Sequence, residues 1–307
     1  DTRKIKKGSL FFALKGKNFN GNKFAAKAIQ DGCSFAIIDE KEYLTNNKFI
    51  LVDDVLKTLQ DLAKHHRRKL SIPVLGITGS NGKTSTKELL KHILSAKFDI
   101  HATEGNYNTS ISLPLTLLQL TSFHGASILE MGASQPGDIK ELCKIANPTH
   151  GLITNISPAH LEGFKTIENV AKTKGALFES LSKGVAFVNV ADNQVAKLKI
   201  FGDKVTFGLT PDCDYPTDLH HEKDGTITLT INAQEVPTNS TNLSFAKNII
   251  ACAAIAQELG LEWDAIIDRI KTFISPKGRC EIKNNGELII IDDTYNANLE
   301  STIAAIN

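Results

Sequence analysis

Cysteine is scarce in this sequence, and its arrangement excludes two ways of stabilising a small protein. The five cysteines are odd in number, stand far apart and form no CxxC pair. Neither a disulfide framework nor a cysteine-based zinc cluster is therefore indicated. This usage fits a reducing compartment, and we expect a cytoplasmic protein.

Long apolar runs and net charge are also missing. No apolar run approaches the roughly 18 residues that a membrane-spanning helix needs, and no signal-type apolar segment follows the opening residues DTRKIKKG. Lysine plus arginine number 35 and aspartate plus glutamate 34, so no overall field attracts nucleic acid or an anionic membrane. We therefore predict no membrane insertion and no nucleic-acid partner, and we expect any anion to be bound by a local site.

The sequence does contain enough apolar material for more than one core, with 41% hydrophobic side chains in 307 residues. Residues 1–71 alternate short apolar runs with helical patterns, which predicts a small α/β domain. From Pro73 onward, buried-type strands alternate with helical stretches, which predicts a mostly parallel sheet flanked by helices. The expected strands are VLGIT, FDIHA, ASILEMG, HGLITNI and GVAFVNV, and the expected helices span about 84–96, 110–120, 137–146 and 167–182.

The last third of the chain has a different pattern. Residues 203–236 are predicted to form a β-rich excursion or an edge of the sheet, followed by helices at 245–260 and 263–273. One further strand, ELIIID, and one further helix, LESTIAAIN, follow. Because one strand and one helix cannot bury a core alone, we interpret residues 277–307 as the beginning of a third domain. The predicted fold is thus a multi-domain α/β protein with a central domain over residues 72–276.

The stretch GITGSNGKTSTKE at residues 76–88 sets a glycine-rich turn between a predicted strand and a predicted helix. Such a turn offers converging backbone N–H groups and the positive end of a helix to a polyphosphate. Lys83 would contact the β- and γ-phosphates, and the Thr84 hydroxyl would ligate magnesium. The usual longer loop has a glycine where this chain has Ile77, so GxxGKT is a shorter variant. The residues predicted to bind ATP here are Gly79, Ser80, Asn81, Gly82, Lys83, Thr84 and Ser85.

The alternative interpretation of this stretch is a glycine turn whose lysine and threonine are incidental. The flanking strand and helix favour the phosphate loop instead. A GTPase would also need a guanine-reading NKxD-type loop after a later strand, and the sequence has none. Adenine is therefore the favoured base.

Further segments follow other strands of the predicted sheet, and in such sheets ligands lie at the carboxyl ends of strands. Glu130 closes a strand, where a carboxylate suits a magnesium ion that bridges phosphates. His160 follows the next strand, and Lys172 and Lys174 lie on the helix after it. On pattern alone, each also fits a plainer role as an exposed acid, a solvated or core histidine, or a solvated lysine. The asparagines of GNYN at 105–108 are likewise compatible with turn chemistry.

Taken in this order, the segments resemble the Mur ligase family over nearly the whole chain. The family's uridine-nucleotide-binding first domain is similar to DTRKIKKGSLFFALKGKNFNGNKFAAKAIQDG, and its ATP loop is similar to GITGSNGKTSTKE. Its central domain resembles GNYNTSISLPLTLL, EMGASQPGDI and NISPAHLEGF, and the start of its Rossmann-like third domain resembles GRCEI with IIDDTYNAN. The specific strings are EMGASQPGDI and DDTYNAN, which look like those of members that add D-Ala-D-Ala to UDP-N-acetylmuramoyl-tripeptide.

The resemblance implies an ATP- and Mg²⁺-dependent ligase of peptidoglycan precursor synthesis, with UDP-N-acetylmuramoyl-tripeptide and D-Ala-D-Ala as substrates. ATP would phosphorylate a carboxylate to an acyl phosphate, which an amine then attacks, and cations already in place would neutralise the charge on that path. The implied catalytic residues are Lys83, Glu130, His160 and Lys174. The implied metal ligands are Thr84, Glu130, His160 and Lys174, the last carbamylated by CO2 so that a cation becomes an oxygen ligand. Further implied contacts are Asn248, Arg279 and Asp293 to ATP, and Thr2, Arg3, Asn106 and Asn108 to the UDP-sugar substrate.

The chain departs from the family pattern at several places. It has NGN at 20–22 where DGH is usual, and Thr109 in place of the last asparagine of GNxNN. In the helix expected beside adenine, Lys247 and Ala251 stand where histidine and asparagine are usual. Two alternatives therefore stay open, namely another Mur-type amide ligase or a nucleotide-binding module of this fold without ligase activity. We expect a monomer, and either lysine or diaminopimelate is compatible as the third residue of the tripeptide.

Overall fold

The computed structural model describes residues 5–158, 161–284, 286, 288–296 and 299–306. The chain divides into two compact units, Asp1–Lys69 and Leu70–Asn307, and each is described by itself. Among the described residues, no helix is both long enough and apolar enough to cross a lipid bilayer. The α/β class predicted from the sequence is confirmed.

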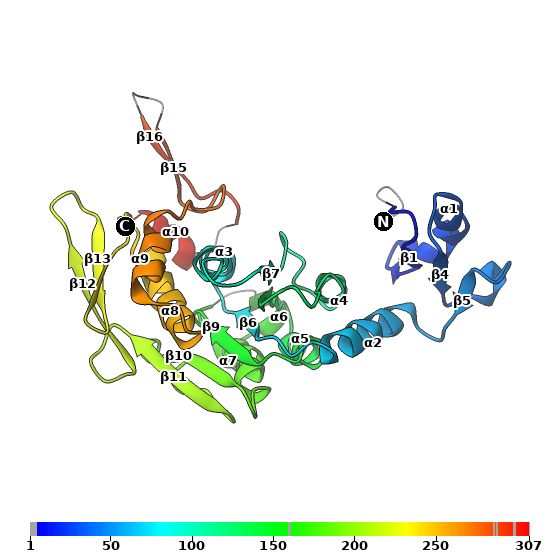
Figure 1. Ribbon diagram of the computed structural model, residues 1–307, viewed down its shortest axis with the longest axis horizontal. Helices are drawn as coiled ribbons and strands as arrows, with labels where there is room; N and C mark the ends of the chain where they lie inside the picture. Colours follow the sequence, from blue (N-terminus) through cyan, green and yellow to red (C-terminus); the bar gives the residue numbers. More distant parts are fainter. Residues whose placement is uncertain (1–4, 159–160, 285, 287, 297–298, 307) are drawn as a thin grey trace. The chain divides into compact units, whose positions relative to one another are not determined.

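The first unit is a small parallel sheet packed against helices (Figure 1). Its elements are β1 (Leu10–Phe12), β2 (Lys15–Gly16), β3 (Phe19–Asn20), η2 (Gly21–Phe24), α1 (Ala25–Gln30), β4 (Phe35–Ile38), η3 (Lys41–Tyr43), β5 (Phe49–Leu51) and α2 (Val55–Arg68). The strands β1, β4 and β5 pair in parallel in that order, and their buried side chains, such as Phe11 and Phe49, form the core. Helix α2 begins at Asp54, whose side chain caps it by accepting a hydrogen bond from the Lys57 N–H at 2.9 Å.

The second unit is built on one large sheet. Its strands are β6 (Val74–Thr78), β7 (Ile100–Ala102), β8 (Ala126–Glu130), β9 (His150–Ile153), β10 (Val185–Asn189), β11 (Asp203–Gly208), β12 (Tyr215–His221), β13 (Ile227–Ile231) and β14 (Gln234–Pro237). They lie in the order β14-β13-β12-β11-β10-β9-β6-β8-β7. Neighbours from β7 to β12 are parallel, whereas β13 and β14 run antiparallel at the edge.

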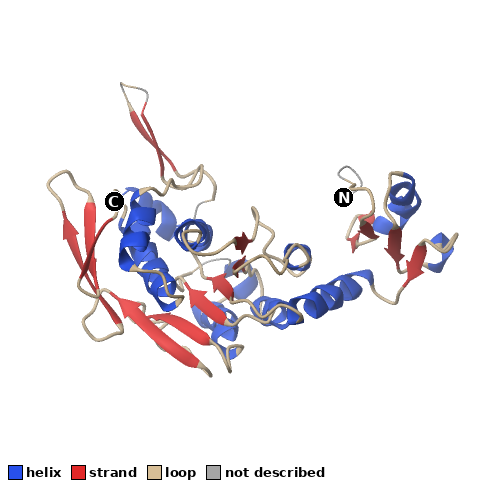
Figure 2. Cartoon of the chain, viewed as in Figure 1, coloured by secondary structure: helices blue, strands red, loops and turns tan. Residues whose placement is uncertain are grey.

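Helices cover both faces of this sheet. They are α3 (Lys83–Leu94), α4 (Ser112–Leu117), α5 (Asp138–Ala146), α6 (Leu161–Phe164), α7 (Ile167–Glu179), α8 (Leu243–Glu258) and α9 (Trp263–Lys271). Leu75 and Ile77 of β6 belong to the core shared with α3, α8 and α9, whereas a Cβ at Gly76 would lie 3.0 Å from Leu177 of α7. Every residue of β6 is buried, as expected for a strand covered on both sides. Figure 2 shows α8 and α9 on one side of the strands and α7 on the other.

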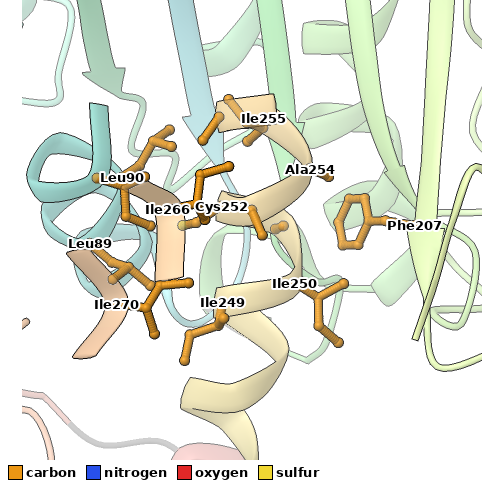
Figure 3. Packing of buried hydrophobic residues seen from close by; sticks show 14 of the residues in the cluster. Leu89, Leu90, Phe207, Ile249, Ile250, Cys252, Ala254, Ile255, Ile266 and Ile270 are labelled. Atoms are coloured by element: carbon orange, nitrogen blue, oxygen red, sulfur yellow. The ribbon is translucent and has the colours of Figure 1, made fainter. Parts of the chain in front are cut away.

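The main core lies between the sheet and helices α3, α8 and α9 (Figure 3). Leu89 and Leu90 of α3 pack in the same cluster as Ile249 of α8 and Ile270 of α9, and Phe207 of β11 borders it. Helix α8 is apolar and buried almost all round from Ile249 onward, which is typical of a helix enclosed by other elements. This packing holds the start of α3 firmly at the end of β6.

The place of β6 in the strand order creates the site. After β6 the chain forms β7 and β8 on one side of it and then returns to form β9 and β10 on the other. At such a reversal the connections diverge, which leaves a crevice at the carboxyl end of the strands. The GxxGKT turn, the end of β8 and the loop after β9 all border this crevice.

Residues beyond β10 agree with the sequence prediction in part. The expected β-rich edge is confirmed, but β11 and β12 extend the parallel sheet rather than forming a separate excursion. The strand expected at ELIIID is confirmed as β16 (Ile289–Asp292), but the expectation of a single strand is wrong, because β16 pairs with β15 (Glu281–Asn284) as a hairpin before α10 (Leu299–Ile306). The polar sequence EIKN of β15 lacks the apolar pattern on which the prediction depended.

Candidate active site

The turn between β6 and α3 has glycines where no other residue fits without strain. Gly79 has a φ of +149°, and a Cβ there would lie 1.9 Å from Thr154 Oγ1. Gly82 has a φ of +81° and precedes the first residue of α3, with a Cβ position 3.1 Å from Asn248 Oδ1. Because glycine lacks a Cβ, the backbone can turn here while staying close to the loop after β9 and to α8.

Hydrogen bonds tie this turn to the loop after β9. The N–H groups of Ser80 and Asn81 donate to the Asn155 carbonyl oxygen and to Asn155 Oδ1, each at 3.0 Å. Thr154 Oγ1 donates to the Asn81 carbonyl at 2.6 Å, and Ser80 Oγ donates to the Ser157 carbonyl at 2.9 Å. The protein itself thus uses these two loop N–H groups. The N–H groups in the first turn of α3, which have no acceptor within the helix, are left to bind an anion.

Glu130 stands at the end of β8 with its carboxylate between two donors. Thr84 Oγ1 donates to Oε2 at 2.7 Å, and Asn108 Nδ2 donates to Oε1 at 2.8 Å. The Glu130 side chain is only 3% exposed, and its backbone N–H donates to Thr103 Oγ1 at 3.0 Å. A hydroxyl and a carboxylate beside a phosphate loop are the oxygen donors that Mg²⁺ prefers, so these residues fit the magnesium ion predicted from the sequence.

Within the described residues, no three histidine, cysteine, aspartate or glutamate side chains converge on one metal position.

Two lysines meet at the phosphate turn. Lys83 Nζ donates to the Gly79 carbonyl at 2.7 Å and Lys174 Nζ donates to the same oxygen at 2.9 Å. Lys174, on α7, is 2% exposed, whereas Lys172 on the same helix is exposed. Burial and then the charge of Lys83 lower the pKa of Lys174 to about 7, and burial also lowers the pKa of Lys83. Two amines on one carbonyl make a place where negative charge is stabilised.

A cavity of about 500 Å³ opens beside these groups, which is large enough for part of a substrate. Its lining includes the basic residues Lys83 and Arg279 and the polar residues Glu130 and Asn108. The guanidinium of Arg279 lies over the ring of Tyr295, 4.0 Å from its centre. This cation–π contact holds Arg279 at the edge of the cavity.

Further cavities lie on the α8 side of the turn. One of about 500 Å³ is lined by Gly82 and Asn248 together with Asp192 and Phe207, and it suits a base or a sugar. A smaller one brings Asn248, Arg279 and Asp293 together. Asp293 Oδ1 accepts a hydrogen bond from the Cys280 N–H at 3.1 Å, which fixes its carboxylate there. The predicted ATP contacts on either side of the predicted third-domain boundary, Asn248 before it and Arg279 and Asp293 after it, therefore line one cavity.

Two family models match the chain. The Mur ligase middle domain matches residues 77–256, and the Mur ligase family catalytic domain matches residues 1–67. The chain belongs to the Mur ligase family.

Curated Mur ligases and solved structures extend this match over the whole chain. This chain is 32% identical to the UDP-N-acetylmuramoyl-tripeptide--D-alanyl-D-alanine ligases of Haemophilus influenzae and Bacillus subtilis. Each alignment covers 100% of this chain, together with 69% of the first relative and 68% of the second. The crystal structure of MurF from Acinetobacter baumannii superposes with a TM-score of 0.90 at 28% identity, covering 99% of this chain and 68% of that one. MurF from Thermotoga maritima in complex with ADP superposes at 0.88 with 30% identity, covering 100% and 72%.

The site residues predicted for a Mur ligase are brought together unequally. Lys83, Thr84, Glu130 and Lys174 meet at the crevice, joined by Asn108. The side chain of Asn106 is exposed, and the Asn106 carbonyl accepts a hydrogen bond from the Asn108 N–H at 2.7 Å. The predictions for Thr2, Arg3 and His160 lie outside the described residues.

Several residues of this Mur ligase site were not predicted from the sequence. Thr154 and Asn155, which shape the turn, stand directly after the apolar run of β9, and a polar pair at a strand end was the available signal. Thr103, which accepts from the Glu130 N–H, has the same position after β7. A side chain whose only task is to hold another one leaves little trace in a single sequence.

Proposed function

We propose that the chain is an ATP-dependent ligase that joins D-Ala-D-Ala to UDP-N-acetylmuramoyl-tripeptide in peptidoglycan precursor synthesis. The observation that carries the proposal is the convergence of Lys83, Lys174, Thr84 and Glu130 at the phosphate turn. Relatives that match the whole chain bear the name of this ligase, and one neighbouring structure holds ADP. The chain's own charge balance and cysteine usage are compatible with a monomer in the cytoplasm, which stays a prediction.

The residues of the turn would bind and orient ATP. The first N–H groups of α3 and the Lys83 ammonium would hold its β- and γ-phosphates, and Arg279, which lines the same cavity, would add a second positive charge. Asn248 and Asp293 line the neighbouring cavity, where the nucleoside would lie. Thr84 and Glu130 would hold Mg²⁺, which when bound offsets phosphate charge.

Lys174 would serve as an oxygen ligand after carbamylation. Its pKa of about 7 leaves a large fraction of the amine neutral at physiological pH, and the neutral amine is the form that adds CO2. The resulting carbamate is an anion, so a side chain that would repel a cation becomes able to bind one. His160 is proposed as a further metal ligand on the basis of sequence alone.

The proposed reaction has two steps. The tripeptide carboxylate attacks the γ-phosphorus of ATP, which gives an acyl phosphate and ADP. The amine of D-Ala-D-Ala then attacks the acyl carbon, the amide bond forms and inorganic phosphate leaves. Lys83 and Arg279, which line the same cavity, would stabilise the negative charge that develops on the phosphoryl oxygens.

The test is phosphate release together with mass spectrometry of the product. Release is expected only when ATP, Mg²⁺, UDP-N-acetylmuramoyl-tripeptide and D-Ala-D-Ala are all present, and both the lysine and the diaminopimelate tripeptide should be supplied. Equal activity with single amino acids would favour another Mur-type amide ligase. ADP binding by calorimetry without product under any combination would favour a nucleotide-binding module.

A further inference from the structure

Helix α3 carries a second lysine that the proposed reaction does not use. Lys87 lies one turn after Lys83 on the same side of the helix, and its side chain is 1% exposed. Its Nζ donates to the Thr103 carbonyl oxygen at 2.5 Å and lies 2.6 Å from Glu88 Oε1. Burying an ammonium removes it from water, and this desolvation costs free energy even when its hydrogen bonds are satisfied. An apolar side chain of similar size would fill this space without that cost.

The residue that Lys87 contacts leads directly to the metal side of the site. Thr103 follows β7, and its N–H donates to the Ile128 carbonyl of β8 at 3.0 Å. Its Oγ1 accepts from the Glu130 N–H at 3.0 Å. Thr103 therefore makes three hydrogen bonds: its carbonyl oxygen accepts one from Lys87 of α3, and its N–H and hydroxyl make one each with β8.

The chain after Thr103 returns to the same carboxylate. Asn108 donates from Nδ2 to Glu130 Oε1 at 2.8 Å, and the Gly132 N–H donates to the Asn108 carbonyl at 2.9 Å. The segment 103–108 thus begins at the Lys87 ammonium and ends on Glu130. Meanwhile Thr84, on the same helix as Lys87, donates to the other oxygen of Glu130.

We propose that Lys87 is a positioning residue, which fastens segment 103–108 to the phosphate helix and so fixes Glu130 and Asn108 relative to Lys83 and Thr84. Through this link the Glu130 carboxylate stays at a fixed distance from the phosphate loop. A hydrogen bond to a backbone carbonyl suits this task, because it depends on the path of the loop and not on its side chains. The inference rests on the proposed nucleotide and magnesium site.

The test compares Lys87→Met with Lys91→Met, a matched control one turn later where the lysine is exposed. Calorimetry measures ADP affinity with and without Mg²⁺. In Lys87→Met we expect the ADP affinity without Mg²⁺ to stay unchanged. The increase in ADP affinity on adding Mg²⁺ should fall by about 10-fold or more, as is typical when a group that orients a metal ligand is removed. Lys91→Met should behave as wild type. An equal Mg²⁺ gain in wild type and Lys87→Met would overturn the proposal.

Hydrogen exchange supplies a second readout that needs no ligand. Amides of segment 103–108 should exchange faster in Lys87→Met, while those of α8 keep their protection. If wild type binds no Mg²⁺–ADP, the proposed function fails, and exchange still decides whether Lys87 holds the segment. Unchanged exchange at 103–108 would overturn that link.

A variant at Thr103 tests the same link if Lys87→Met fails to fold. Thr103→Val keeps the carbonyl that Lys87 contacts and removes only the hydroxyl that accepts from the Glu130 N–H. It should lose the Mg²⁺-dependent increase in ADP affinity in the same way. The double variant Lys87→Met/Thr103→Val should lose no more of this increase than the more affected single variant. A Thr103→Val protein with the full Mg²⁺ gain would contradict the proposed path to Glu130.

Discussion

At the residue scale, Lys174 is the side chain whose state depends most on its surroundings. It is buried against the Gly79 carbonyl, and the Lys83 charge lies nearby. Both effects favour the neutral amine and bring the pKa to about 7. Lys172, two residues earlier, points to solvent and lacks this environment.

We predict that Lys174 becomes carbamylated as the pH rises from about 6 to about 8, because the neutral fraction grows through its pKa of about 7. Nuclear magnetic resonance with isotope-labelled bicarbonate should give a carbamate signal at the higher pH. The signal should vanish in Lys174→Ala and persist in Lys172→Ala. A signal that survives Lys174→Ala would show that another amine is modified.

The same pKa shift predicts how stability responds to pH in the uncarbamylated chain. The ordinary pKa of lysine is 10.5, so between about pH 7 and 10.5 the unfolded chain binds the proton that the folded chain has lost. The free energy of unfolding therefore rises with pH across this window. Urea unfolding in bicarbonate-free buffer should show a flatter rise for Lys174→Met. Equal slopes for the two proteins would contradict the assignment.

Gly79 is a residue whose position leaves no room for a Cβ. We predict that Gly79→Ala lowers the free energy of unfolding by about 1–3 kcal/mol and weakens ADP binding, because a Cβ would overlap Thr154 Oγ1 at an unfavourable φ. Gly225→Ala is the control, since Gly225 also has a positive φ but only an ordinary contact at 3.8 Å. Similar losses in both variants would mean that the backbone angle and not the close contact decides.

At the scale of elements, α3 connects the site to the core. Its first turn carries Lys83 and Thr84, and its later turns bury Leu89 and Ile93 against α8 and α9. The apolar residues recur three and four positions apart, so one side of the helix faces the core. The packing of the second half therefore determines where the first half presents its N–H groups.

We predict that Leu89→Ala destabilises the second unit by about 2–5 kcal/mol, because Leu89 is fully buried and its removal leaves a cavity. Leu243→Ala, at an exposed leucine that begins α8, should cost less than about 1 kcal/mol. Chemical denaturation monitored by circular dichroism measures both. A small loss in Leu89→Ala would mean that the neighbouring helices collapse into the space.

The elements of the central sheet could be predicted closely, for a physical reason. β6, β8 and β9 are buried on both faces, so their sequences are continuous apolar runs that differ from the amphipathic helices between them. β15 was missed because a polar strand in an exposed hairpin needs no such run. The strand order was not predicted either, since it depends on which runs pair and not on their composition.

At the scale of the whole molecule, the described nucleotide and metal residues all belong to the second unit. The two cavities of about 500 Å³ beside the phosphate turn are lined by residues after Leu70, and the main core lies there as well. The first unit has its own small sheet and core. The described residues of the proposed phosphate site thus lie in one of the two units, whereas the proposed UDP-sugar contacts Thr2 and Arg3 belong to the other.

We predict that residues 70–307 expressed alone bind Mg²⁺–ADP with the affinity of the whole chain, because every described residue of the phosphate site is retained. The same fragment should fail to bind the UDP-sugar substrate with wild-type affinity. Calorimetry with ADP and with UDP-N-acetylmuramoyl-tripeptide measures both. Loss of ADP binding in a folded fragment would show that the first unit contributes to that site.

The sequence by itself determined the α/β class, the phosphate turn and the strand-end acid Glu130, because each depends on short-range patterns of apolar residues and glycines. The GxxGKT turn predicted where Lys83 and Thr84 lie, and the resemblance added Lys174. Only the tertiary structure decided that Lys174 is buried beside Lys83, and that Lys87 and Thr103 connect α3 to Glu130. Burial, pKa and hydrogen-bond partners depend on residues far apart in the chain, so they exist only once the sheet and its helices have packed.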